Sequence, residues 1–182
     1  MAIERFLPKF HVVEINNSTA HRIGHAIAQV PAYVGQAKDS DGQATTDYAL
    51  ISSVEKNGIK FVENGIIVGL DSTGVLANYD SSKHSKPCLV YNDELITGPL
   101  TSLNRFAEEA EDGEPVYVRA LPLYLGDTFT TDNFSGEAAD GYAKVVDGIL
   151  TLTASSTDAL FIATKTTMPN GEVGMEFMYI GA

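Results

Sequence analysis

The sequence predicts a mainly β protein: a small antiparallel β-barrel or sandwich with one inserted α-helix and an extended N-terminal arm. Three observations lead to this fold class. Short apolar runs recur about every 8–12 residues, four Asn-Gly or Asp-Gly dipeptides are flanked by such runs, and a single segment has clear helical spacing. Many short strands with one helix are typical of barrels and sandwiches rather than of parallel α/β folds.

Length and charge limit the possible functions. The chain has 182 residues, of which 44% are apolar, so it can bury a core without disulfides or metal. A net charge of −12 disfavours partners that bind by phosphate neutralisation, which excludes nucleic acid and anionic membrane surfaces as expected partners. The single cysteine, Cys88, and the lack of a signal or membrane-spanning run predict a soluble protein made in a reducing compartment.

The first 38 residues differ in charge from the rest. Up to Lys38 there are four basic and two acidic residues, whereas the remainder has eight basic and twenty-two acidic ones. Pro8 breaks any early helix, and residues 18–30 fit a helix or an extended chain equally well. We interpret residues 1–38 as an extended arm that contacts a partner, with chance clustering of charge as the alternative. The remaining predicted units are residues 39–114, a β-meander plus helix, and residues 115–182, a small β-barrel.

Turn dipeptides mark the strands of the central unit. Asn57-Gly58 and Asn64-Gly65 predict two type I′ hairpin turns, because these pairs readily supply two positive φ angles, and Thr73-Gly74 predicts a further turn. The predicted strands are residues 51–55, 59–63, 66–70, 75–79 and 88–91.

Residues 101–113 carry the helical pattern. Leu103, Phe106, Ala107 and Ala110 follow i, i+3, i+4, i+7 spacing, residues 101–102 offer a capping hydroxyl, and an Asp-Gly pair ends the segment.

The pattern returns to strands after Pro115. Asp147-Gly148 predicts a tight hairpin, and Asn170-Gly171 precedes the last strand. The predicted strands are residues 116–121, 128–131, 143–146, 149–153, 160–164 and 174–180.

Candidate chemical residues form no recognised motif. His21 and His25 have i, i+4 spacing but lack the glutamate of a zinc protease, and residues 39–42 resemble the start of a calcium loop whose later ligands are missing. Asp127 and Asp132 could form a glycosidase-like acid pair, but their neighbours favour turn or capping roles. We therefore expect no catalytic residues, no metal, no cofactor and no enzymatic activity.

Two stretches together resemble a known class of protein. Residues 115–136 (PVYVRALPLYLGDTFTTDNFSG) and the hairpin of residues 143–155 (AKVVDGILTLTAS) resemble the small β-barrel of head decoration, or cement, proteins of tailed bacteriophages. The segment CLVYNDELITGPLTSLNRFAEEAEDGEPVYVR is similar to a strand-helix-strand passage of phage head proteins. The resemblance covers about the last hundred residues.

The resemblance implies a structural role on the exterior of a virion. The protein would be made in the bacterial cytoplasm, bind the major capsid protein on the expanded head, and contact neighbouring copies of itself, for example in a trimer. The arm would supply apolar anchors, namely Phe6, Leu7, Phe10, Val12, Val13 and Ile15. This arm hypothesis also predicts that the body folds without residues 2–17. A tail, baseplate or fibre component and a carbohydrate-binding β module with a row of exposed aromatics are the alternatives.

Overall fold

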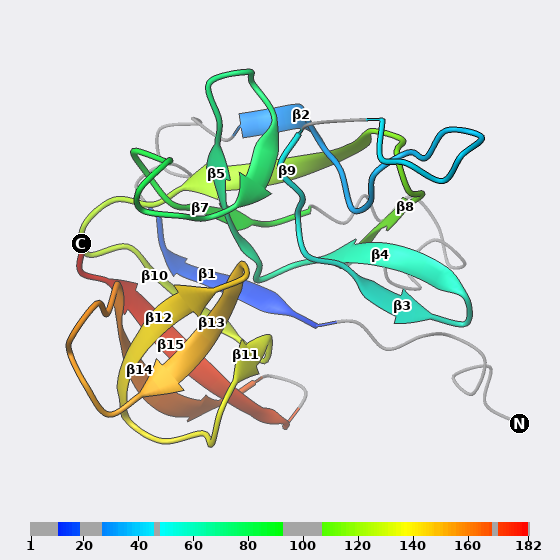
Figure 1. Cartoon of the computed structure of the whole chain (residues 1–182). Helices are drawn as coiled ribbons and strands as arrows, with labels where there is room; N and C mark the ends of the chain where they lie inside the picture. The colour runs from blue at the N-terminus through cyan, green and yellow to red at the C-terminus, as the bar shows by residue number, and fades with distance from the viewer. Residues whose placement is uncertain (1–10, 19–26, 46–47, 93–106, 169–170, 182) are drawn as a thin grey trace, which may run out of the picture.

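The computed structural model describes residues 11–18, 27–45, 48–92, 107–168 and 171–181. All the regular secondary structure within these residues is β-strand. The prediction of a mainly β protein is therefore confirmed. The strands form a closed five-stranded barrel, a three-stranded sheet and a seven-stranded sheet (Figure 1).

The barrel has the strand order β2-β6-β5-β7-β9. Its strands are β2 (Ile27–Ala32), β5 (Ile67–Leu70), β6 (Leu76–Asn78), β7 (Cys88–Val90) and β9 (Val116–Pro122). Residues 62–69 form an unbroken buried run, because the chain here enters a strand that is covered on both faces. The β5–β6 hairpin closes through Gly74, whose φ is 83°, and through Asp71, whose carboxylate accepts hydrogen bonds from the backbone N–H groups of Thr73 and Val75.

The three-stranded sheet consists of β3 (Val54–Lys56), β4 (Ile59–Glu63) and β8 (Ala107–Ala110), in the order β3-β4-β8. The turn predicted at Asn57-Gly58 is confirmed, with φ angles of 56° and 78°. The hairpin predicted at Asn64-Gly65 is wrong, since only Gly65 has a positive φ and β4 and β5 belong to different sheets. The chain uses this turn to cross from one sheet to the next.

The helix predicted over residues 101–113 is not supported. Ala107–Ala110 forms β8, which pairs antiparallel with β4 from Glu63↔Ala107 to Lys60↔Ala110, and residues 101–106 lie outside the described chain. The β4 edge offers backbone partners to this segment, and tertiary pairing outweighs the modest helical preference of Ala and Glu.

The seven-stranded sheet has the order β1-β10-β15-β14-β12-β13-β11. Its strands are β1 (Val13–Asn17), β10 (Thr128–Thr131), β11 (Phe134–Ser135), β12 (Gly141–Val146), β13 (Ile149–Thr153), β14 (Phe161–Thr167) and β15 (Val173–Tyr179). The hairpin predicted at Asp147-Gly148 is confirmed, with φ angles of 49° and 78°. Phe129, Phe161 and Phe177 pack ring against ring in its core, with centroids 5.7–6.2 Å apart.

The extended N-terminal arm is likewise not supported in the part of residues 1–38 that the structure describes. β1 is the outer strand of the seven-stranded sheet, paired with β10, and β2 pairs with β9 inside the barrel. The alternation of Val13 and Ile15 with Glu14 and Asn16 explains this, because it gives β1 an apolar face toward the core. Residues 27–30, where helix and extended chain were both open, lie in β2, and residues 19–26 are outside the described chain.

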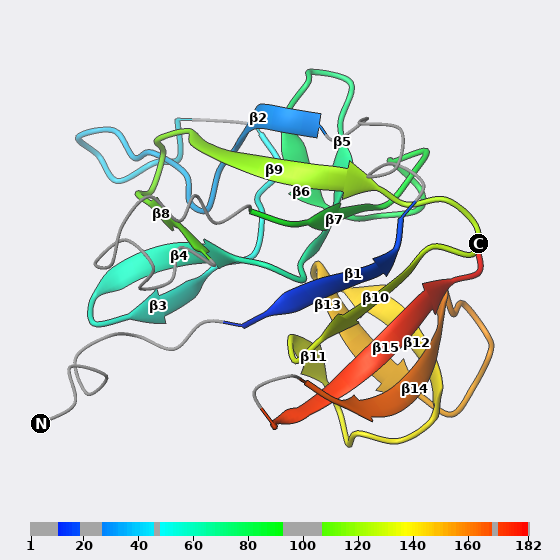
Figure 2. The same cartoon turned by 180° about the vertical axis from the view of Figure 1, so that it is seen from behind.

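Strand β1 runs between the barrel and the rest of the seven-stranded sheet (Figure 2). The barrel takes strands from residues 27–32, 67–90 and 116–122, so the predicted boundaries at residues 38 and 114 both fall between strands of one barrel. Segments distant in sequence therefore meet where the two sheets face each other.

Candidate binding cleft and sheet junction

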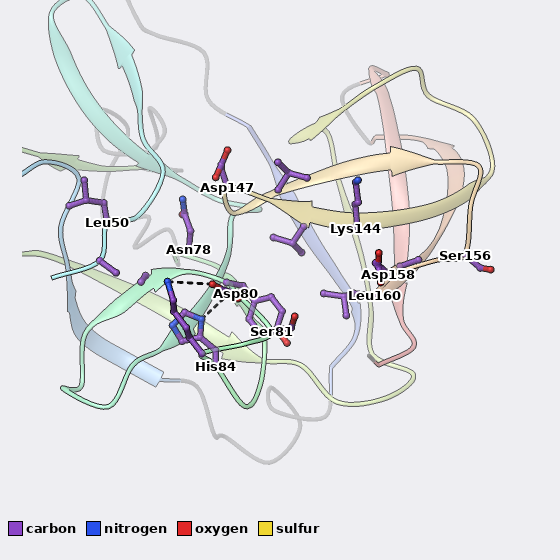
Figure 3. A pocket seen from close by; sticks show the side chains of 17 residues that line it. Leu50, Asn78, Asp80, Ser81, His84, Lys144, Asp147, Ser156, Asp158 and Leu160 are labelled. Carbon is purple, nitrogen blue, oxygen red and sulfur yellow. Dashed lines mark hydrogen bonds and ion pairs between the residues drawn. The ribbon is translucent and has the colours of Figure 1, made fainter.

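A cleft of about 800 Å³ opens between the barrel and the seven-stranded sheet (Figure 3). One wall is the chain that follows β6, which contributes Ser81 and His84. The other wall comes from β12 and the β13–β14 loop, with Lys144 and Asp158. The cleft thus lies between two sheets, and its shape depends on how they are joined.

The β12–β13 hairpin fixes the contact between the barrel and the seven-stranded sheet. The carbonyl of Gly148 accepts a hydrogen bond of 2.7 Å from the backbone N–H of Ile67, and the carbonyl of Asp147 accepts one from the hydroxyl of Ser52. A Cβ atom on Gly148 would lie only 2.5 Å from Oδ1 of Asn78, so glycine is required for this close approach. The hairpin tip therefore docks directly onto the barrel.

Asn78, on the barrel, supports this contact by binding Ser52. Its Oδ1 accepts a hydrogen bond of 2.8 Å from the backbone N–H of Ser52, and its Nδ2 donates to Ser52 Oγ at 2.9 Å. Both polar atoms of this side chain are thereby engaged, and the wall of the cleft is held by hydrogen bonds on each side.

The barrel wall is built around His84, which is buried. Its Nδ1 accepts a hydrogen bond of 3.0 Å from the backbone N–H of Asp80, so the proton of the neutral imidazole is on Nε2. The ring lies on Gly69, where a Cβ would come within 2.2 Å of His84 Cγ. Hydrogen bonds from Ser82 lower the pKa of the Asp80 carboxyl, assisted by Lys83, whose Nζ lies 3.4 Å away.

The sheet wall lines the cleft with polar groups that have no partner among the described residues. Within the described chain, the Lys144 ammonium, the Asp158 carboxylate and the Ser156 hydroxyl have no hydrogen bond or ion pair. Asp158 has a φ of 58°, in the left-handed region that Asp tolerates better than most residues. These groups are available to a ligand.

A second polar cluster lies where β1 meets the three-stranded sheet. The Glu63 carboxylate is only 1% exposed, and its Oε1 lies 2.6 Å from Lys56 Nζ. His11 Nε2 is 3.7 Å from Glu63 Oε2, while His11 Nδ1 is 3.3 Å from Asp132 Oδ1. The hydrogen bond with Asp132 raises the pKa of His11, although burial of the imidazole opposes this shift. Burial of the Asp132 carboxyl raises its pKa, but hydrogen bonds from His11 and from the Val12 N–H outweigh burial, so the pKa of Asp132 is lowered overall.

Buried amides tie the sheets together beside this cluster. Asn133 Nδ2 donates to the Asn64 carbonyl at 2.7 Å, and the Asn92 backbone N–H donates to Asn64 Oδ1 at 2.7 Å. Gly65 lies against them, since a Cβ there would be 2.9 Å from both Thr131 Oγ1 and Asn133 Cβ. These contacts fasten the turn after β4 to the turn after β10, which is a structural role.

The predicted anchor residues divide into two groups. Phe6, Leu7 and Phe10 lie outside the described chain. The other three lie in or beside β1: Val13 is 6% exposed within the core, Ile15 packs against that core, and the Val12 carbonyl accepts a hydrogen bond from Thr131 Oγ1. Contact of any of these side chains with a second protein stays a prediction.

The candidate acid pair is not assembled. Asp127 and Asp132 lie at opposite ends of β10, which at roughly 3.3 Å per residue separates them by about 16 Å, too far for a glycosidase pair. Asp127 accepts a hydrogen bond from the Tyr124 N–H at 3.0 Å, while Asp132 binds His11. Burial raises the pKa of the Cys88 thiol to about 11, which keeps it protonated at neutral pH.

The candidate calcium loop gives no ligand cluster either. Residues 39–42 form an exposed turn in which Asp39 Oδ1 accepts the backbone N–H groups of Asp41 and Gln43. His21 and His25 are outside the described chain, and within it no three His, Cys, Asp or Glu residues are placed to hold a metal ion. The part of the chain that the structure describes also contains no helix able to cross a membrane.

No local sequence signal marks the cleft, because its groups come from segments that become neighbours only when the two sheets dock. Comparisons with protein-family models, curated proteins and solved structures find no match to this chain.

Proposed function

We propose that this chain is a structural protein of a tailed-bacteriophage virion, a decoration or cement protein on the outside of the expanded icosahedral head. Its partners would be the major capsid protein and neighbouring copies of itself, and it would act by binding rather than by catalysis. The resemblance of residues 115–136 and 143–155 to head decoration proteins supports this proposal.

One surface observation supports the proposal. Tyr117 and Leu125, at 57% and 74% exposure, are the two most exposed large apolar side chains of the described chain, and both lie within residues 115–136. Leu125 lies against Gly181, next to the exposed Ile180. Exposed aromatic and aliphatic side chains of this kind are what protein interfaces bury. The segment that carries the resemblance thus also presents two candidate anchor side chains.

Such binding would stabilise the head by mass action. A protein that binds the expanded shell but not its precursor favours the expanded state by about 2.7 kcal/mol per site when its free concentration is 100 times Kd. Repetition over many equivalent sites multiplies this modest contribution, which opposes the outward pressure of packaged DNA.

Cryo-electron microscopy of the virion tests the proposal. We expect copies at regular positions on the outer surface of the head, in contact with the major capsid protein. Location on the tail, baseplate or fibres would overturn the head assignment, and absence from purified virions would overturn the virion role. Cosedimentation with stripped capsids adds a state-specific test: expanded capsids should bind the protein, and unexpanded precursors should not.

A further inference from the structure

The cleft between the barrel and the seven-stranded sheet has the dimensions of a small-molecule site. Its volume of about 800 Å³ lies within the range of roughly 300–1,000 Å³ that ligand pockets occupy. It is distinct from the exposed side chains of Tyr117 and Leu125, neither of which lines it. It can therefore be considered independently of the proposed capsid contact.

The walls of the cleft are formed before any ligand arrives. The hydrogen bonds from Ile67 to the Gly148 carbonyl and from Ser52 to the Asp147 carbonyl hold the hairpin against the barrel, and His84 is packed on Gly69. Walls held in this way lose little conformational entropy on binding, so the entropy cost falls mainly on the exposed side chains of Lys144 and Asp158.

The cleft presents hydrogen-bonding groups that the described residues leave unused. Lys144 offers three donors and Asp158 offers two acceptor oxygens, both from the sheet wall, and neither has a partner in the described chain. The Ser156 hydroxyl lies on the same wall, whereas Ser81 lies on the barrel wall opposite (Figure 3). A ligand between them would meet donors and acceptors on both sides.

The balance of charge and polarity selects the ligand class. Three aspartates outnumber two lysines around the cleft, so an anion such as phosphate would gain no net attraction. An apolar ligand would desolvate Lys144 and Asp158 without replacing their hydrogen bonds to water, which is costly. A neutral ligand rich in hydroxyl groups avoids both costs, because each hydroxyl can donate to a carboxylate and accept from an ammonium group.

Apolar side chains complete this complementarity. Val145 and Leu160 also line the cleft, beside the polar groups of the sheet wall. A sugar ring has hydroxyl groups at its rim and C–H groups on its faces, so it matches a lining in which both kinds of group alternate. We propose that the cleft binds a short neutral saccharide, with Lys144 and Asp158 as its main hydrogen-bonding groups.

Binding of four neutral trisaccharides to the full-length protein tests this site. Maltotriose, cellotriose, mannotriose and tri-N-acetylchitotriose are titrated by calorimetry, with saturation-transfer NMR to detect weak contacts. We expect at least one to bind with a Kd of about 1 mM or below. Lys144→Ala and Asp158→Asn should each weaken that binding by about tenfold, since hydrogen bonds to charged groups are the stronger ones. Asn tolerates the left-handed backbone of residue 158 as Asp does.

Matched variants separate the cleft from general effects of charge. Lys165→Ala, on the exposed part of β14, and Asp41→Asn, in an exposed turn, make the same charge changes away from the cleft and should bind like the wild type. The proposal is overturned if none of the four sugars binds at about 10 mM, roughly ten times the expected Kd, or if the cleft variants bind as the controls do.

Discussion

His11 Nδ1 lies 3.3 Å from Asp132 Oδ1, and this contact joins the segment before β1 to the residue that follows β10. The other imidazole nitrogen faces the buried carboxylate of Glu63, which also binds Lys56. The N-terminal part of the described chain is therefore held by charge as well as by strand pairing, and its stability must depend on pH.

We predict that the free energy of unfolding falls as pH rises above neutrality. The folded protein raises the pKa of His11 above 6.5, so this contribution is complete below 6.5 and is lost as pH rises through the raised pKa. Between pH 5.5 and pH 9, the free energy of unfolding should decrease by about 0.5 kcal/mol less in His11→Gln than in the wild type. The difference is small because the imidazole is 41% exposed and screened by solvent. Urea unfolding at both pH values measures the difference; equal losses in wild type and variant would refute the role of His11.

Asp132 acts in the opposite direction. Its pKa is lowered below 3.8 in the folded protein, so its contribution is complete above 3.8 and disappears as pH falls through the lowered pKa. The pair is therefore strongest between about pH 4 and pH 6.5. Asp132→Asn should make the free energy of unfolding less dependent on pH in the acid range. If the two residues act together, Asp132→Asn should also remove most of the effect of His11→Gln.

Gly65→Ala should be much more destabilising than Gly74→Ala. Both glycines have positive φ, 87° and 83°, so both variants incur a backbone cost of about 1–2 kcal/mol. Only at Gly65 would the new methyl group meet close neighbours, Thr131 and Asn133, whereas no atom lies within 4 Å of the corresponding position at Gly74. We expect an additional loss of about 1–3 kcal/mol for Gly65→Ala in urea unfolding. Equal losses would mean that the junction yields to the added methyl.

Deletion of residues 2–17 should now destabilise the body, contrary to the arm hypothesis. The deletion removes β1, its pairing with β10 and the buried side chain of Val13, and it leaves β10 as an exposed edge. We expect a loss of about 2–4 kcal/mol in urea unfolding, together with self-association. Within the full chain, Val13→Ser should destabilise and Glu14→Ser, on the exposed face of β1, should not. A truncated protein that unfolds at the wild-type midpoint would restore the arm hypothesis.

Local signals predicted the strands well and the tertiary pairings poorly. The hairpins at Asn57-Gly58 and Asp147-Gly148 were predictable because a type I′ turn needs two positive φ angles that these dipeptides supply. Asn64-Gly65 has the same dipeptide signal, yet the strands on either side of it, β4 and β5, belong to different sheets. Strand β8 likewise pairs with β4, which lies more than forty residues earlier in the sequence. The cleft depends on such long-range docking, so Lys144 and Asp158 carried no local signal.

Leu125 and Tyr117 provide the most direct test of capsid attachment. Leu125→Ser and Tyr117→Ser should leave the unfolding midpoint nearly unchanged, because side chains exposed by 74% and 57% add little to the core. Each should weaken cosedimentation with expanded capsids by about tenfold or more if it anchors the interface, since interface anchors contribute more than about 1–2 kcal/mol. Val173→Ser is the matched control, because Val173 is also 52% exposed but lies on β15, outside the segment that resembles decoration proteins. Equal attachment of all three variants would place the interface elsewhere, whereas selective loss at residues 117 and 125 would identify the docking surface.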